Sequence, residues 1–159
     1  MQTTLFPMKT KTDFGGIHSR GKRKSARPLC TKRTIHLVMK ASSRVKFRKN
    51  RLVQSEIELA ARKWGVRVYR LAIESDHLHL LIRIPTRMAY RFFIQRISGA
   101  IALKLQMRWL MRPFTRIVGW GREFRRVRTY IEMNELEALG FIARQPRGRG
   151  AMKERFSDS

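Results

Sequence analysis

Hydrophobic and polar positions along the middle of the chain predict strands that alternate with amphipathic helices. From Thr34 to Ala41 (TIHLVMKA), every second residue is a large aliphatic one, which is typical of a half-buried strand. Two β-rich segments, 66–74 (VRVYRLAIE) and 77–84 (HLHLLIRI), are separated by the polar pair Ser75-Asp76, and Pro85 ends the second of them. These two segments predict a β-hairpin.

Three helices are expected beside these strands. Ser55 and Glu58 have the spacing of a capping box near the start of the first helix, and Gly65 stands where a helix stops. Thr86 can cap a second helix, whose apolar residues recur at three- and four-residue steps through about Met111. A short strand over 114–118 and a last helix over about 123–139, closed by Gly140, complete the predicted elements.

The order strand, helix, strand, strand, helix, strand, helix predicts an α+β fold. It resembles a ferredoxin-like split βαβ arrangement, with helices packed on an antiparallel sheet. The expected organisation is a basic N-terminal arm over 1–33, one folded domain over 34–141 and a basic C-terminal tail over 142–159. Both tails are expected to be disordered, because they are rich in Gly and basic residues and lack periodicity.

The charge of the chain indicates a polyanionic partner. Thirty-six Lys and Arg residues against eleven Asp and Glu residues give a formal net charge of +25. Nucleic acid is the obvious polyanion. No uninterrupted apolar run is long enough to span a bilayer, and the single cysteine, Cys30, excludes a thiolate metal cluster and a disulfide framework. A cytoplasmic, nucleoid-associated protein with no membrane partner is therefore expected.

Two groups of basic residues are candidate DNA contacts. A solvated tail and a solvated helix face are the alternatives for them. The candidates are Lys22, Arg23, Lys24, Arg27, Lys32 and Arg33 in the arm, and Arg125, Arg126 and Arg128 on the last helix.

Two pairs of residues are candidates for chemistry. His77 and His79 leave the same face of a strand, where their imidazoles can bind a divalent cation, although such a pair is also common as a surface or packing feature. Tyr130 and Asn134 are one turn apart on the last helix and share one helical face. A phenol next to a metal-bound phosphodiester can act as a nucleophile, and the Asn134 amide oxygen could complete the metal site. On spacing alone, Tyr130 is equally well interpreted as a helix-surface tyrosine.

The segment DHLHLLI, followed by YIEMN, resembles the single-tyrosine branch of the His-hydrophobe-His (HUH) endonucleases. This branch includes insertion-sequence transposases and REP-associated tyrosine transposases, and the similarity extends over about residues 15–141. The resemblance implies that 34–141 is a catalytic domain in which His77, His79 and Asn134 bind Mg²⁺ or Mn²⁺ and Tyr130 is the nucleophile. Insertion-sequence transposases usually have Gln at the position of Asn134, so Asn134 favours the REP-associated group.

The resemblance implies a metal-dependent enzyme that cleaves and rejoins single-stranded or hairpin DNA through a 5′-phosphotyrosine intermediate. Relatives of this kind act as dimers or as monomers, so a homodimer is one expectation. The alternative is a non-catalytic, basic nucleic-acid-binding protein derived from a transposase. Glu74 and Asp76 are expected to hydrogen bond to the imidazoles, with a turn as the alternative for Asp76, and His36 is expected to lie outside the metal site. Four aromatic residues could stack on unpaired bases, although burial is the commoner role for such residues: Trp64, Trp120, Tyr69 and Phe114.

Overall fold

The structure, a computed structural model, describes residues 12–16, 21, 25–43, 47 and 51–143. Its elements are β1 (Asp13–Phe14), β2 (Thr34–Lys40), α1 (Arg51–Trp64), β3 (Arg67–Ile73), β4 (His77–Arg83), α2 (Arg87–Lys104), β5 (Phe114–Val118) and α3 (Arg122–Leu139). The strands form one antiparallel sheet in the order β1-β5-β2-β4-β3. The predicted α+β split βαβ fold is confirmed.

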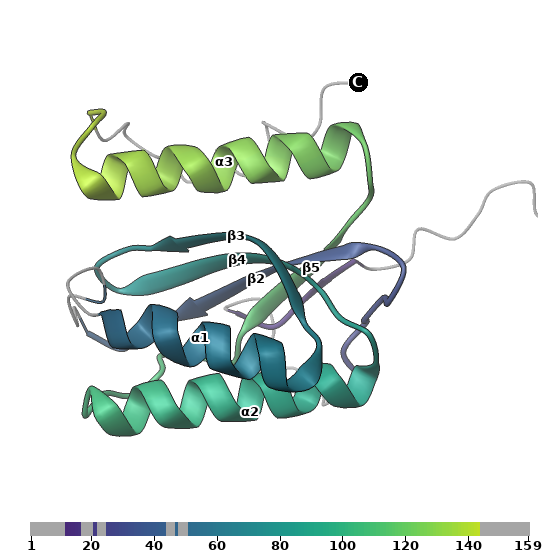
Figure 1. Ribbon diagram of the computed structural model, residues 1–159, viewed down its shortest axis with the longest axis horizontal. Helices are drawn as coiled ribbons and strands as arrows, with labels where there is room; N and C mark the ends of the chain where they lie inside the picture. The colour runs from purple at the N-terminus through teal and green to yellow at the C-terminus, as the bar shows by residue number, and fades with distance from the viewer. Residues whose placement is uncertain (1–11, 17–20, 22–24, 44–46, 48–50, 144–159) are drawn as a thin grey trace, which may run out of the picture.

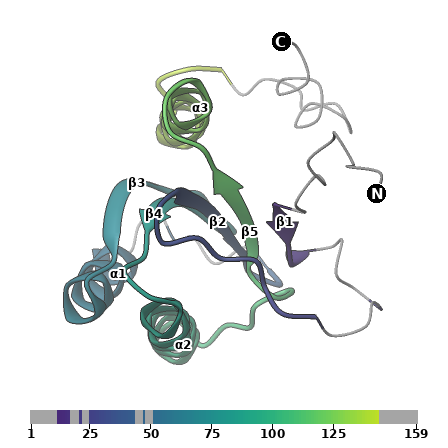
Figure 2. The same ribbon diagram turned by 90° about the vertical axis from the view of Figure 1, so that its right-hand side faces the viewer.

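The helices form a layer on each face of the sheet. Helices α1 and α2 cover one face, and α3 lies alone across the other face (Figures 1 and 2). The larger hydrophobic core lies on the α1 and α2 side, where Leu78, Leu80 and Ile82 of β4 pack with Ile57 and Phe93. A smaller cluster joins α3 to the sheet, and it comprises Ala72, Leu81, Val118, Val127 and Ile131. No helix in the described ranges is both long and apolar enough to cross a membrane.

The ends of two helices differ from the sequence prediction. Helix α1 begins at Arg51, so Ser55 lies inside the helix and the predicted capping box does not start it. Val53 and Ile57 are both fully buried, and this apolar face extends the helix upstream of Ser55. Helix α2 ends at Lys104 rather than near Met111.

Other predicted boundaries are confirmed. The Thr86 hydroxyl accepts a hydrogen bond from the backbone N–H of Ala89 at 3.0 Å and caps α2. Gly140 follows α3 with φ +80°, a left-handed conformation that favours glycine, and its N–H bonds to the carbonyl of Glu137.

Part of the segment that the sequence assigned to the basic arm belongs to the folded unit. Strand β1 extends the sheet beyond β5, with Asp13 opposite Arg116 and Phe14 opposite Thr115. Arg27 holds this segment: its guanidinium donates a 2.7 Å hydrogen bond to the Thr115 hydroxyl and lies 4.6 Å from the centroid of the Phe14 ring. A strand of two residues is too short to produce a periodic pattern, which explains why the sequence did not reveal it.

Arg27 therefore has a structural role, which the sequence analysis did not assign to it. Its guanidinium is engaged by Thr115 and Phe14, and its carbonyl accepts two 2.9 Å hydrogen bonds from Arg87. The neighbouring candidates Lys32 and Arg33 are exposed, whereas Lys22, Arg23 and Lys24 lie outside the described residues.

We predict that Arg27→Ala releases β1 from the sheet and lowers the free energy of unfolding by about 1–3 kcal/mol, because a partly buried hydrogen bond and a cation–π contact are lost. Amide hydrogen exchange measures this locally, since the Ile117 N–H bonds to the Thr12 carbonyl at 3.1 Å. Protection of Ile117 should fall. Arg33→Ala, which removes an exposed arginine, is the control, and equal protection of Ile117 in both variants would contradict the structural role of Arg27.

Candidate active site

The two candidate metal-binding histidines lie on the face of the sheet that α3 covers. Because side chains alternate along β4, His77 and His79 point away from Leu78 and Leu80, which are in the larger core. The imidazole rings of His77 and His79 are 4.9 Å apart between centroids, and only 15% and 5% of the two side chains are exposed. The sequence prediction that they share one face is confirmed by this geometry.

Glu74 joins these histidines across the β3–β4 hairpin. Its backbone N–H bonds to the carbonyl of His77 at 2.9 Å, which fixes its position opposite the start of β4. Its buried carboxylate oxygen Oε1 lies 3.0 Å from Nε2 of His77 and 3.5 Å from Nε2 of His79. One acidic and two imidazole donors therefore converge on one point, and their ligand atoms all lie within 4.8 Å of one another.

The second nitrogen of each imidazole is held by another residue. Nδ1 of His77 is 2.6 Å from Oδ1 of Asp76, and Nδ1 of His79 is 3.1 Å from Nε2 of His36. The His36 and His79 rings are stacked, with centroids 5.4 Å apart. Partners at Nδ1 fix the orientation of each ring and direct Nε2 towards Glu74.

The charges in this cluster shift the pKa values of its members. Burial alone would raise the pKa of the Glu74 carboxyl, but hydrogen bonds and charge from His77 and His79 outweigh burial and lower it. Burial would lower the pKa of His77, yet Glu74 and Asp76 raise it. His36 is fully buried, and burial followed by the nearby His79 and Arg116 lowers its pKa well below the ordinary value, so His36 is neutral.

Tyr130 lies beside the same histidines. Its ring centroid is 5.8 Å from that of His79 and 6.2 Å from that of His36, both in edge-on contact. The tyrosine is half-buried on α3 and packs against the smaller cluster, which includes Val127 and Ile131. A phenol next to one imidazole of the Glu74, His77 and His79 cluster can attack a group bound there.

Asn134 occupies the same helical face one turn after Tyr130. Its side chain is buried, as the four-residue spacing from Tyr130 requires for a face that packs on the sheet. Two further contacts hold α3 on this sheet: Arg70 of β3 lies 2.6 Å from the Glu135 carboxylate and 3.8 Å from the Glu132 carboxylate.

The donors fit a divalent cation. Ligands at about 2.1 Å from a metal are separated by about 3.0 Å at a right angle and by about 3.4 Å at a tetrahedral angle. The distances of 3.0 and 3.5 Å from Glu74 Oε1 to the two imidazole nitrogens match these separations. Two imidazoles and one carboxylate also suit Mn²⁺ better than imidazoles alone.

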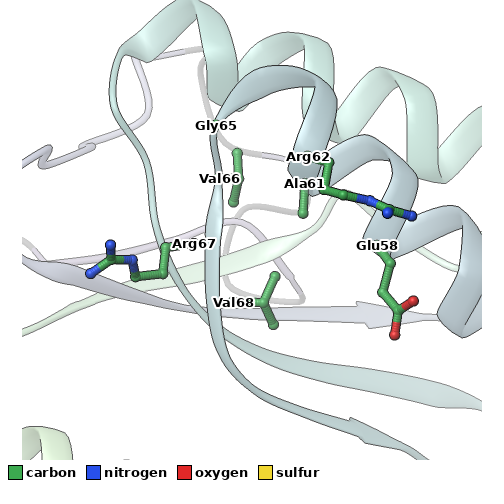
Figure 3. A pocket seen from close by; sticks show the side chains of 7 residues that line it. All are labelled: Glu58, Ala61, Arg62, Gly65, Val66, Arg67 and Val68. Atoms are coloured by element: carbon green, nitrogen blue, oxygen red, sulfur yellow. The ribbon is translucent and has the colours of Figure 1, made fainter.

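The remaining sequence candidates lie outside this cluster. Arg125, Arg126 and Arg128 are exposed on α3, and Arg128 pairs with Glu132 at 3.4 Å. A shallow hollow between α1 and β3 includes none of the catalytic candidates; its lining comprises Glu58, Ala61, Arg62, Gly65, Val66, Arg67 and Val68 (Figure 3). The guanidinium groups of Arg62 and Arg67 point away from each other there, so the hollow lacks convergent polar groups.

The sequence analysis underestimated two residues. His36 was expected to be outside the metal site, and it contacts both His79 and Tyr130 without being one of the three convergent donors. Glu74 was expected to support the histidines, and it faces the same point as they do. The pairing of the strands would have revealed both residues. His36 is on β2 and Glu74 follows β3, and these two strands flank β4 on either side.

Comparison with known proteins gives a family match over most of this unit. The family described as "Transposase IS200 like" matches residues 30–134. No curated protein matches the chain significantly in sequence. The chain is similar in fold to a REP-associated tyrosine transposase bound to a REP hairpin, with a TM-score of 0.58 and 15% identity over 76% of each chain. It is also similar to a proposed transposase from Deinococcus radiodurans R1, with a TM-score of 0.46 and 17% identity over 70% of this chain and 98% of that chain.

We predict that Glu74→Gln destabilises metal-free protein by about 1–3 kcal/mol, and that the effect depends on pH. The lowered pKa of Glu74 gives stability that is present above its unfolded value of about 4.3 and is lost as the pH falls. The raised pKa of His77 gives stability that is present below about 6.5 and is lost as the pH rises through the folded value. The loss on substitution should therefore be largest between about pH 5 and 6.5.

Urea unfolding in EDTA at pH 5.5 and pH 8.5 measures this dependence. Glu132→Gln is the matched control, because Glu132 pairs with two arginines that stay charged at both pH values. An effect of Glu74→Gln that is the same at both pH values would contradict the ion pair.

Proposed function

Because the chain belongs to the IS200-like transposase family, we propose that it cleaves and rejoins DNA strands with Tyr130 as the nucleophile. The observation that carries the proposal is the contact of Tyr130 with His79, at the edge of the convergent Glu74, His77 and His79 donors. A buried carboxylate between two imidazoles beside a tyrosine favours chemistry over binding alone.

The metal would be held by His77 and His79 through Nε2 and by Glu74 through Oε1, with Asn134 as a further oxygen donor from α3. Mg²⁺ and Mn²⁺ both accept such ligands. The chemistry that such a metal would supply is orientation of the scissile phosphate and neutralisation of the charge that develops on its oxygens. Asp76 and His36 keep the imidazoles in the required orientation.

In the proposed reaction, the Tyr130 hydroxyl oxygen attacks the phosphorus of a phosphodiester. A bond forms between this oxygen and phosphorus, and the bond from phosphorus to the 3′ oxygen breaks. The phenol loses a proton and the 3′ oxygen gains one, which leaves a 5′-phosphotyrosine and a free 3′-hydroxyl. Attack by another 3′-hydroxyl reverses the step and joins strands, so the reaction needs no nucleotide cofactor.

The proposed substrate is single-stranded or hairpin DNA in the nucleoid. A relative of similar fold is bound to a REP hairpin, and the formal charge of +25 on this chain suits a polyanion. Exposed arginines and lysines would contact phosphates, among them Lys32, Arg33, Arg125, Arg126 and Arg128. The homodimer expected from the resemblance stays a prediction.

We predict that the protein forms a covalent adduct with end-labelled hairpin DNA in Mn²⁺, and that Tyr130→Phe forms none, because the attacking oxygen is absent. Denaturing gel electrophoresis detects the adduct. Tyr90→Phe is the matched control, since it removes a phenol hydroxyl from α2 on the opposite face of the sheet and leaves Tyr130 in place. Equal adduct from the parent and Tyr130→Phe, or no adduct from either over a broad set of hairpins, would refute the proposal and favour a binding protein.

We also predict that His77→Ala, His79→Ala and Glu74→Gln each weaken Mn²⁺ binding by about 10-fold or more, since substitution even of groups that only support ligands costs 10- to 100-fold. Calorimetric titration of metal-free protein measures the affinity directly. DNA affinity should be retained, because it depends on distributed phosphate contacts. If the histidine variants lose Mn²⁺ binding and Glu74→Gln does not, then Glu74 is not a ligand; if none loses it, the metal site itself is wrong.

A further inference from the structure

An exposed aromatic side chain stands at one end of the sheet, away from the histidines. Trp120 lies in the connection between β5 and α3, and 48% of it is exposed. Its indole N–H donates a 2.7 Å hydrogen bond to the carbonyl of Lys32, which satisfies its polar atom within the protein. What remains exposed is therefore an apolar ring surface.

Two further aromatic rings pack against the indole. Its centroid lies 5.1 Å from the ring of Phe124 in a tilted contact and 5.6 Å from that of Tyr69 in an edge-on contact. Tyr69 and Phe124 also meet edge-on at 5.4 Å. These three side chains, called here the Trp120 platform, hold the indole in a fixed orientation.

Exposed basic residues lie near the Trp120 platform. In Figure 1 this is the right-hand end of the sheet, where β2 and β3 begin, β4 and β5 end and α3 begins. The Arg83 guanidinium donates to the Thr31 carbonyl at 3.1 Å, which places it next to the Lys32 and Arg33 segment. Lys32, Arg33 and Arg83 are exposed, and no ion pair found within the described ranges involves any of them.

An exposed aromatic ring among free cations is the combination that binds unpaired nucleotides. The stacking of each base on the ring stabilises the complex by about 1–3 kcal/mol, and the cations attract the phosphates. From the exposed indole ring and the basic residues near it, we infer that the Trp120 platform is a stacking site for an unpaired base of the DNA strand. The inference rests on the proposed function for the identity of the ligand as DNA.

The position of the platform relates it to the candidate active site. Tyr69 and Phe124 pack against the same cluster as Tyr130, so the platform and the nucleophile share the α3 side of the sheet. Trp120 lies two residues before α3 begins at Arg122, and Tyr130 lies eight residues further along the helix, about 12 Å at the helical rise of 1.5 Å per residue. A stacked strand covers that distance in about four nucleotides at 3.4 Å each. The platform would thus hold a base near, and outside, the cleavage site.

We predict that Trp120→Ala weakens binding of a hairpin with a single-stranded extension by about 5- to 150-fold, the factor that corresponds to 1–3 kcal/mol. Binding of the same hairpin without the extension should be unchanged. Fluorescence anisotropy over a range of KCl concentrations measures both. Using Tyr130→Phe protein in EDTA removes cleavage and metal from the measurement, so this result stands whether or not the catalytic proposal does.

Salt dependence separates stacking from charge. Trp120→Ala should lower the affinity and keep the slope of log affinity against log salt, whereas Arg33→Ala should reduce that slope by about one. Trp120→Phe should restore most of the affinity. Trp64→Ala is the matched control, since it removes a tryptophan stacked on Phe92 in the opposite helix layer and should change neither probe.

Three results would overturn the inference: unchanged affinity of Trp120→Ala, equal loss for both probes, or a loss that appears only as a shallower slope. If Trp120→Ala does not fold, a second measurement tests the inference on protein that retains Trp120. Iodouracil in the extension is crosslinked by light and the modified residue is identified by mass spectrometry. An adduct on Trp120 supports the platform, and adducts found only elsewhere refute it.

Discussion

The alternation of side chains along β4 is the constraint on which the structure depends. This strand lies between β2 and β3, so both of its edges are paired and two hydrogen-bonded ladders fix its register. Leu78 and Leu80 enter the larger core, and for that reason His77 and His79 must emerge under α3. A slip of one residue would exchange the two sets and bury the imidazoles among aliphatic side chains, at a cost far above the value of any single contact.

The two neighbours of β4 each supply one group to the histidines. Glu74 follows β3 and meets both Nε2 atoms, and His36 on β2 meets Nδ1 of His79. This half of the candidate site is as rigid as the sheet. Tyr130 has a different origin, because α3 is held on the sheet through side chains rather than a backbone ladder. These contacts include its small apolar cluster and the ion pairs of Arg70 and Arg116. If Tyr130 is the nucleophile, as proposed, it would adjust to a strand of DNA while the Glu74, His77 and His79 donors keep their spacing.

Elements with a regular spacing of hydrophobic residues could be predicted from the sequence. Contacts that depend on the pairing of distant segments could not. The alternation in β4 and the helical spacing of Tyr130 and Asn134 are local properties, and the structure bears out both. Contacts of His36 and of Arg27 join residues 43 and 88 positions apart, and no local pattern records them. The start of α1 was misplaced because the burial of Val53, a tertiary effect, overrides the capping signal at Ser55.

Acidic and basic groups lie at opposite ends of β4. This arrangement explains how a protein with a high positive charge could also hold a cation at the candidate site. Glu74 and Asp76 make the hairpin end locally acidic, whereas Arg83 and its basic neighbours occupy the opposite end of the same strand. His79 and Arg83 are four residues apart, or about 13 Å at 3.3 Å per residue. The Debye length at physiological ionic strength is about 8 Å, so solvent reduces the repulsion that exposed arginines at that distance would exert on an ion at the histidines. Under the proposed function, phosphates would therefore be attracted at one end of the sheet with little effect on a metal at the other.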